Sequence, residues 1–460
     1  MQDDTLIYSR SKYDEENLNL DIIYKLITVH ASESKRLKTL KDYYLGKHDI
    51  LNHKRRSNLP NFKTVANHAK DIADTSTGYF MGNSITYTNT SEADIEPLLN
   101  AFDKADVDHV DNENALNMAI YGRAYEFIYA KEDEVELSVR SLEPENTFIV
   151  YDDSIEQCPL FAVYYYDITD DVSQNTTYKA EVLTENYHYH MTLRGFENAD
   201  NESSEPEEHH MGAIPIVEYR NNGLMIGDYE QQLVLIDAYN SLTANRVNDK
   251  EQAINSILVL YGASLADSAE EAHEAMQILI EEGLLELPAD AKADFLNNVL
   301  DENAIEVLRK ALKQDIYTFS HVPNLTDENF ASNVSGVAME YKLFGLEMIT
   351  KTKEQHYSKS LRKRIKLFCN YLGLKQIALD AKAIVPQYKR GLPKNLLELS
   401  QIINNLDGKV SLRQLISLLP FVEDPDAELK ALEEEQENKT DEAPAFVQNL
   451  PLDEEDDVDE

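Results

Sequence analysis

The chain has 460 residues, of which 42% are hydrophobic, and its 84 acidic residues against 43 basic ones give a formal net charge of −41. This length and hydrophobic content suffice for about two to four folded domains, but the charge argues against a protein that grips DNA by neutralising its phosphates. A disulfide framework, a secretory signal and a membrane span are not expected, because there are only two cysteines, the N-terminus is acidic and no apolar run approaches ~18 residues.

The N-terminal part of the chain is expected to be helical. A helix over residues 18–45 is predicted from three apolar residues at helical spacing: Ile22, Leu26 and Val29. It overlaps a basic stretch over residues 35–56, for which a solvated surface is the favoured interpretation and contact with nucleic acid the alternative. Asn58-Leu59-Pro60 predicts the start of a second helix that continues to Phe80, and a strand over residues 84–88 follows.

Between about residues 115 and 218 the pattern changes to strands. Segments rich in Tyr, Phe, Val and Thr are separated by charged or Asn-containing turns, and they predict one antiparallel sheet from residues 124–130, 135–142, 147–151, 160–166 and 187–193. His188, His190 and the pair His209-His210 raise the question of a metal site. Without an HExxH motif or a cysteine partner, exposed strand and loop histidines are the favoured interpretation.

A long helix is predicted over residues 228–261, which contain neither Pro nor Gly and would extend roughly 50 Å. Its apolar stripe is thin and is interrupted by four polar residues: Asn240, Asn245, Asn248 and Asp249. Such a helix is expected to pack against copies of itself or to bridge domains rather than to lie in a core.

The C-terminal half is expected to remain mainly helical. A mixed insert over residues 264–300 contains a predicted acidic helix over 270–282 and a short strand near 284–287. An amphipathic helix is predicted over 301–320, with its apolar face formed by Ile305, Leu308, Leu312, Ile316 and Phe319. After a polar loop over 324–335, a helix over 337–372, basic in its second half, leads to short helices that reach Pro420.

The tail beyond Ala431 has the composition of a disordered segment. Residues 421–460 contain 17 acidic residues and two lysines, a net charge of −15, so the remaining 420 residues still carry −26. The favoured explanation of this charge is solubility. The alternative is a surface that DNA passes without adhering to it.

Motifs for catalysis are not found in the sequence. There is no GxxxxGK[ST] phosphate-binding loop and no GxSxG nucleophile elbow. Asp152-Asp153 lies in a predicted turn, where Asp is favoured for backbone reasons. We therefore expect no catalytic residue, no cofactor and no metal, and the alternative is a hydrolase that uses some of the abundant carboxylates.

One segment of the sequence carries a family resemblance. Residues 322–342 contain Pro323, an acidic turn, an Asn and then Ser335-Gly336-Val337-Ala338 before a helix. This order resembles the signature segment of portal proteins from long-tailed phages of Gram-positive hosts. Further similarities follow in chain order over residues 67–82, 235–239, 390–395, 408–411 and 418–424, so the resemblance spans about residues 42–428. Ala331-Ser332 departs from the pattern, because a Gly is common there.

The resemblance implies an α+β portal fold that forms a ring of twelve subunits, with a mainly helical stem and crown and a sheet-containing wing. The implied regions are the wing (1–227), a stem helix (228–263), the clip (264–300), a second stem helix (301–322), the tunnel loop (323–336), the tunnel helix and crown (337–430), and the acidic tail (431–460).

The function implied is that of a portal vertex subunit, through which double-stranded DNA is packaged into a capsid and ejected from it. The implied partners are further copies of the chain, the terminase motor, a head–tail connector, and capsid and scaffolding proteins, in the virion and in the host cytoplasm during assembly. The residues expected to face DNA are those of the tunnel loop: Asn324, Thr326, Asn329, Ser332, Asn333, Val334 and Ser335. On composition alone this loop is an ordinary helix connection, and the alternative function is a non-portal head-assembly or scaffolding protein.

Overall fold

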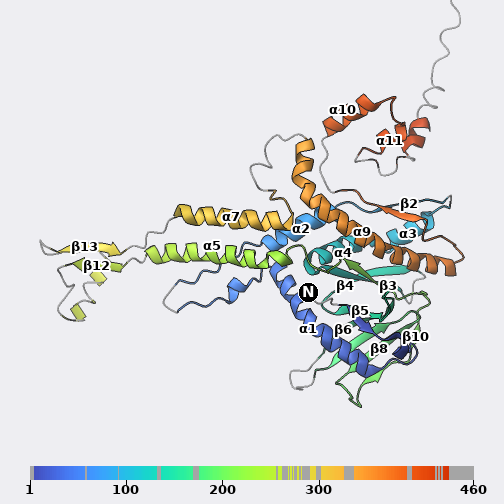
Figure 1. Ribbon diagram of the computed structural model, residues 1–460, viewed down its shortest axis with the longest axis horizontal. Helices are drawn as coiled ribbons and strands as arrows, with labels where there is room; N and C mark the ends of the chain where they lie inside the picture. The colour runs from blue at the N-terminus through green and yellow to red at the C-terminus, as the bar shows by residue number, and fades with distance from the viewer. Residues whose placement is uncertain are drawn as a thin grey trace, which may run out of the picture. The chain divides into compact units, whose positions relative to one another are not determined.

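The computed structural model of the chain describes residues 5–56, 60–91, 93–131, 136–168, 176–254, 257–261, 291–296, 302–325, 336–390, 396–419 and 428–434, with isolated residues between 268 and 281 and at 422 and 425. The chain divides into two compact units, Met1–Gly391 and Leu392–Glu460, which are described separately. Helices and strands are both abundant, so the fold class is α+β, as predicted (Figure 1).

The first unit contains most of the secondary structure. Its helices are α1 (Leu20–Tyr44), α2 (His68–Met81), α3 (Glu96–Lys104), α4 (Val107–Tyr121), α5 (Leu233–Ile254), α7 (Glu302–Ser320) and α9 (Gly336–Leu374). Its strands are β1 (Leu6–Tyr8), β2 (Thr86–Asn89), β3 (Arg123–Ala130), β4 (Leu137–Leu142), β5 (Thr147–Asp152), β6 (Pro159–Asp167), β7 (Tyr178–Leu183), β8 (Tyr187–Leu193), β9 (Glu202–Ser203), β10 (Glu207–Glu208), β11 (Ile216–Arg220), β12 (Ile257–Tyr261), β13 (Lys292–Leu296) and β14 (Ile384–Gln387).

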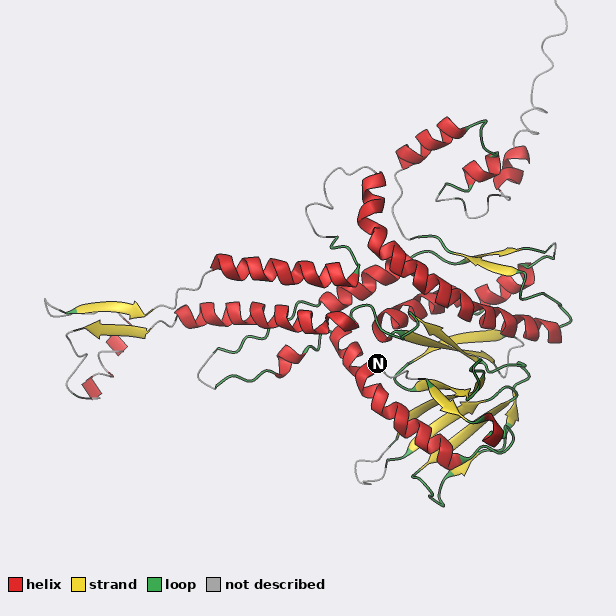
Figure 2. Ribbon diagram, in the orientation of Figure 1, coloured by secondary structure: helices red, strands yellow, loops and turns green. Residues whose placement is uncertain are grey.

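The strands between residues 120 and 220 form two sheets, whereas the sequence predicted one. The larger sheet has seven strands in the order β1-β5-β6-β7-β8-β10, with β9 also paired to β8. Its β1 runs parallel to β5, while the other pairs are antiparallel. A separate sheet has the order β11-β3-β4 (Figure 2). The sequence missed β7 and β11, which are short and carry charged residues among their apolar ones.

Helix α1 covers one face of the larger sheet. Asn19 caps the helix, because its side chain accepts hydrogen bonds from the backbone N–H groups of Asp21 and Ile22. The buried stripe includes Ile23 and Ile27, which share a core with the sheet. The predicted stripe was one position out of phase: Ile22 and Leu26 are partly buried and Val29 is exposed. The extent of the helix was predicted correctly.

Helix α2 begins later than Asn58-Leu59-Pro60 predicted. Its first residue is His68, and the Asn67 side chain caps it by accepting a hydrogen bond from the Lys70 N–H. Residues 61–67 have no regular secondary structure and bind α5 through side-chain contacts, described below. The region from residue 115, where strands were expected to begin, still belongs to α4.

Helix α5 ends before the predicted Tyr261. It stops at Ile254, and Ile257–Tyr261 forms β12, which pairs antiparallel with β13. The run Ile-Leu-Val-Leu-Tyr is apolar and contains β-branched residues, which favour a strand over a helix once a partner strand is available. The predicted strand near residues 284–287 lies outside the described residues, and those described between 270 and 281 are helical.

The second unit contains α10 (Leu396–Leu406) and α11 (Leu412–Ile416). Leu415, Ile416 and Val422 are its buried apolar residues among those described. Residues 428–434 are helical, so helix extends into the first residues of the predicted disordered tail. The rest of that tail lies outside the described residues. Across the described part of the chain, no helix is long and apolar enough to cross a lipid bilayer.

The stability of the first unit is expected to depend on pH because two of its histidines, His30 and His68, are buried. Burial lowers the pKa of His30 in α1 to about 3 and that of His68 in α2 to about 4. Between these values and the ordinary 6.5 the unfolded chain binds more protons than the folded one, so stability falls as the pH is lowered through this window.

Each histidine is expected to contribute up to about 1.4 kcal/mol per pH unit to this loss of unfolding free energy. Urea unfolding between pH 7 and pH 5 measures the slope. His30→Phe should flatten it, while replacement of the exposed His109 by Phe should not. Equal slopes in His30→Phe and in the unmodified chain would contradict the prediction.

Candidate functional site

Helices α5 and α7 lie side by side and form a two-helix arm (Figure 1). In the sequence they precede and follow the segment that contains β12 and β13. Arg246 of α5 bridges two acidic residues of α7, with 2.9 Å from its guanidinium to both Glu302 and Glu306. Arg309 of α7 pairs with Glu306 at 2.7 Å and donates a hydrogen bond of 2.7 Å to the Tyr239 hydroxyl on α5. These contacts fix the two helices against each other along their length.

The asparagines of α5 have a role within the chain that the sequence did not reveal. Asn240 and Asn248 are buried, and their side-chain oxygens accept hydrogen bonds from the backbone N–H groups of Ala66 (2.8 Å) and Phe62 (2.6 Å). Asn248 also donates to the Phe62 carbonyl at 3.1 Å. Asn240 and Asn248, which interrupt the apolar stripe, therefore bind backbone groups of residues 61–67. This segment is neither helix nor strand, so its backbone groups need such side-chain partners.

The base of the arm rests on α2. The Tyr317 hydroxyl of α7 donates to Asp71 at 2.5 Å and lies 3.2 Å from Nδ1 of His68. The His68 ring also packs edge-on against Tyr239 of α5, with ring centroids 4.8 Å apart. Three helices distant in sequence thus meet at one aromatic cluster.

Helix α7 ends where the predicted DNA-facing segment begins. His321 takes a left-handed backbone conformation with φ 58°, Val322 is buried, and Pro323 cannot continue a helix. Asn324 is the one residue predicted to face DNA that lies within the described part of the chain, and it is partly buried. Thr326, Asn329, Ser332, Asn333, Val334 and Ser335 lie outside the described residues, so their mutual arrangement stays a prediction.

The chain resumes at Gly336 in α9, whose first part presents apolar side chains to solvent. Tyr341, Phe344 and Met348 share one helix face by their spacing and are all more than half exposed. Phe319, near the end of α7, is likewise 61% exposed. The predicted apolar face of α7 is therefore only partly covered within one chain: Ile316 is buried, whereas Leu308 and Phe319 are not.

The second part of α9 is held by a buried ionic cluster. Arg364 is fully buried and its guanidinium contacts Glu126 of β3 at 2.6 Å and Asp111 of α4 at 2.6 Å. The Tyr219 hydroxyl donates to Glu126, and the Tyr357 hydroxyl donates to Asp111. Burial alone would lower the pKa of Arg364, but the charges of Asp111 and Glu126 raise it well above its ordinary value, so the residue stays charged.

A second buried pair connects α9 to the start of the arm. The Lys353 ammonium group contacts the carboxylate of Asp228, and both side chains are only 4% exposed. Lys353 also donates to the Ser76 hydroxyl of α2 at 2.6 Å, and the Asp228 N–H donates to the Ala119 carbonyl at 2.8 Å. Asp228 lies five residues before α5, so this pair fixes α9 relative to the segment that leads into the arm.

That segment also depends on close backbone contact. A Cβ atom on Gly122, whose φ is +80°, would lie 2.1 Å from the Met225 carbonyl oxygen, and one on Gly227 would lie 2.4 Å from that of Ile120. Only glycine permits this approach between the end of α4 and the turn before α5.

Sequence reasoning described the second half of α9 as basic but did not identify Lys353 and Arg364 as buried. Their acidic partners lie 125 to 253 residues away in the sequence. The sequence held a weak indication of this burial, because Arg364 lies among apolar helix positions that are buried: Leu361, Ile365 and Phe368. Burying an arginine there costs free energy unless acidic side chains neutralise its charge.

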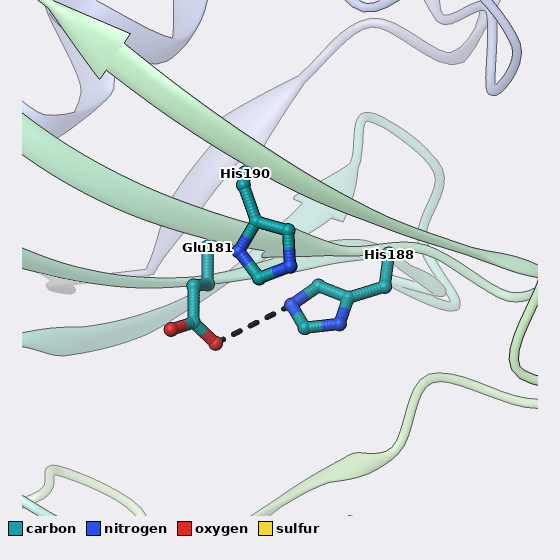
Figure 3. Close-up of side chains that lie close together, drawn as sticks. All are labelled: Glu181, His188 and His190. Atoms are coloured by element: carbon teal, nitrogen blue, oxygen red, sulfur yellow. Dashed lines mark ion pairs between the residues drawn. The ribbon is translucent and has the colours of Figure 1, made fainter. Parts of the chain in front are cut away.

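The two cysteines are not paired with each other. Both are free, and burial raises the pKa of the Cys369 thiol to about 11, which keeps it protonated at neutral pH. Among the described residues one group of side chains is arranged to share a metal ion: Glu181, His188 and His190 (Figure 3). The sequence weighed the two histidines without their carboxylate partner, because Glu181 lies on the neighbouring strand.

Comparison with known proteins gives a match over nearly the whole chain. The model of a family described as "Phage portal protein, SPP1 Gp6-like" matches residues 23–442. The portal protein of Bacillus phage SPP1 is 24% identical over 442 residues, covering 90% of this chain and 86% of that protein. The portal protein of Clostridium phage phiCD119 is 25% identical over 233 residues, covering 49% of this chain and 50% of that protein.

Among solved structures, a chain from the neck of an empty GTA particle has a TM-score of 0.44 and is 12% identical. The match covers 76% of this chain and 88% of that one.

Proposed function

The chain belongs to the SPP1 Gp6-like family of phage portal proteins, and on this basis we propose that it is the subunit of a ring-shaped DNA channel at one vertex of a phage capsid. Double-stranded DNA passes through the ring into the capsid during packaging and out of it during ejection. The family match over residues 23–442 carries this function. A non-portal head-assembly or scaffolding protein is not favoured, because the match covers both units.

We propose that twelve copies assemble into the ring. Exposed apolar side chains on α7 and α9 support assembly, because Phe319, Phe344 and Met348 lose their contact with water only when another chain covers them. The proposed further partners are the terminase motor, a head–tail connector, and capsid and scaffolding proteins. The ring is placed at the capsid vertex of the virion, and free subunits in the host cytoplasm during assembly.

We propose the regions of the subunit from the family resemblance, with bounds that follow the helices and strands. The wing comprises residues 1–227 with both large sheets, and the stem comprises α5 and α7. Because α5 ends at Ile254 and β12 pairs with β13, we place the start of the clip at β12 rather than at residue 264. Helix α9 is the proposed tunnel helix, and the crown is proposed for the residues after it, up to residue 430.

The chain itself is proposed to have no catalytic activity. ATP hydrolysis belongs to the motor, in keeping with the missing phosphate-binding loop in the sequence. The carboxylate of Glu306, for example, has a lowered pKa because it pairs with Arg309 and Arg246, two contacts that hold α5 and α7 together. This use of carboxylates differs from the paired acid and base of a hydrolase.

The tunnel loop over residues 323–336 is the proposed DNA contact. Asn329, Ser332, Asn333 and Ser335 can donate hydrogen bonds to phosphate oxygens without adding positive charge, and Asp327 and Glu328 weaken a sustained grip. The net charge of −41 keeps the duplex from adhering to the rest of the channel. DNA is thus touched briefly and slides in both directions.

Deletion of residues 328–334 is expected to leave ring assembly intact and to impair packaging, because α7 and α9 are anchored to α2, α4 and β3 by contacts outside the loop. Packaging of phage DNA into proheads in vitro, with negative-stain images of the deleted ring, measures both effects. A deletion that abolished rings would show the loop to be a structural element, and unimpaired packaging would remove it as the DNA contact.

A further inference from the structure

Strands β7 and β8 bring together three side chains that the portal function does not use. In the antiparallel register Glu181 lies directly opposite His190, and His188 is two residues from His190 on the same strand. Residues two apart on a strand, and residues directly opposite on neighbouring strands, point to the same face of a sheet. All three side chains therefore share one face, as Figure 3 shows.

The three side chains are spaced for a shared ligand. Oε2 of Glu181 lies 3.3 Å from Nε2 of His188, and one ligand atom from each of the three residues lies within 4.8 Å of the others. A zinc ion bound at about 2.0–2.2 Å holds neighbouring ligand atoms roughly 3.3–3.5 Å apart. The Glu181–His188 pair already has this spacing, and a rotation of the exposed His190 side chain completes it.

The side chain of His188 carries a buried nitrogen atom without a well-formed hydrogen bond. Its Nε2 atom is shielded from water and makes no hydrogen bond of acceptable geometry among the described residues, although Oε2 of Glu181 is near. A buried polar atom left in this state costs free energy, and a bound ion is one way in which proteins satisfy such an atom. The His188 ring also packs edge-on against Phe127 of β3, with ring centroids 6.4 Å apart.

The donors select the kind of ion. Two imidazoles with ring centroids 4.4 Å apart repel each other when both are protonated, but as neutral rings both offer nitrogen lone pairs. Oε2 of Glu181, which lies 3.3 Å from Nε2 of His188, adds an oxygen ligand to these two nitrogens. Two nitrogens and one oxygen suit zinc, cobalt, nickel or copper, whereas magnesium and calcium prefer oxygen ligands only.

We propose that Glu181, His188 and His190 bind one divalent transition-metal ion, best matched by zinc, which ties β7 to β8. His190 is exposed, so water can supply a further ligand to the ion. Glu207 of β10 lies opposite His188 in the register and offers another carboxylate on the same face. The bound ion would stabilise the pairing of these two strands of the larger sheet. The proposal does not depend on the portal function.

Titration of the full chain, freed of metal with EDTA, with cobalt chloride tests the site. We expect visible d–d absorption that saturates at one ion per chain, is displaced by zinc, and accompanies a rise in the unfolding temperature. His190→Ala should weaken binding at least about tenfold and abolish that rise. The matched control is His109→Ala, which removes another exposed histidine beside a glutamate, Glu113, and should bind as the unmodified chain does.

Glu181→Gln provides a second test, because it keeps the shape of the side chain but removes the charge, and circular dichroism confirms that each variant is folded. It should also weaken cobalt binding about tenfold or more. Cobalt binding that is equal in the unmodified chain, His190→Ala and Glu181→Gln would overturn the proposal. So would the absence of saturable absorption in the unmodified chain.

Discussion

Arg364→Met is expected to lower the free energy of unfolding of the first unit by about 3–5 kcal/mol, or to prevent it from folding. The substitution leaves Glu126 and Asp111 buried without their shared cation, since Arg364 is fully buried and contacts both at 2.6 Å. Uncompensated buried charge is among the largest destabilising effects of a point mutation. Urea unfolding followed by circular dichroism, at one protein concentration, measures the loss.

Two further variants separate this mechanism from a general loss of packing. Adding Glu126→Gln and Asp111→Asn to Arg364→Met removes the stranded charges and should recover much of the stability, because a buried ionic cluster replaced as a whole often costs little. Arg194→Met removes an arginine at the surface, paired with the exposed Glu202, and should cost about 1 kcal/mol or less. A loss in Arg364→Met as small as in Arg194→Met would contradict the account of the cluster.

Phe344→Lys combined with Met348→Lys is expected to convert rings into single subunits. Both residues lie on the exposed apolar face of α9, and we propose that a neighbouring subunit covers this face. A lysine ammonium group buried there without a partner costs several kcal/mol per subunit contact, and the cost is repeated around a ring. Size-exclusion chromatography with light scattering measures the change.

Ile155→Lys is the matched control for this change. Ile155 is a fully exposed apolar residue in the turn between β5 and β6, distant in sequence from the α7 and α9 face, and its replacement should leave assembly unchanged. Intact rings in the Phe344→Lys, Met348→Lys chain would show that this face is not the subunit interface. Unfolding of that chain, detected by circular dichroism, would show that the face supports the subunit itself.

Elements with strong local periodicity were predicted closely from the sequence. The helices over 301–320 and 337–372 correspond to Glu302–Ser320 and Gly336–Leu374, because apolar spacing and the breaker Pro323 determine them locally. The end of α5 was missed, because Ile257–Tyr261 becomes a strand only when paired with Lys292–Leu296. Long-range pairing overrides local preference there.

The contacts that hold the candidate site depend on distant partners, and this limits what the sequence predicts. The polar residues of α5 interrupt its apolar stripe, from which we predicted packing against copies of the chain or a bridge between domains. Two of them, Asn240 and Asn248, bind backbone groups of residues 61–67 within the chain, and periodicity carries no information about these partners. The proximity of Glu181 to His188 likewise could not be predicted, because it depends on the register between β7 and β8.

The tunnel loop rests on family resemblance alone, since the residues predicted to face DNA, apart from Asn324, lie outside the described part of the chain. The fold supports the loop indirectly. It anchors α7 on one side through Tyr317 and α9 on the other through Lys353 and Arg364, so the loop joins two fixed helices.

Negative-stain or cryogenic electron microscopy of the purified full chain tests the central claim most directly. The account predicts closed rings with a central channel, and counting subunits in end-on views should give twelve. A protein that remained monomeric at every concentration and salt tested, with no rings in the images, would contradict the portal function proposed for this chain.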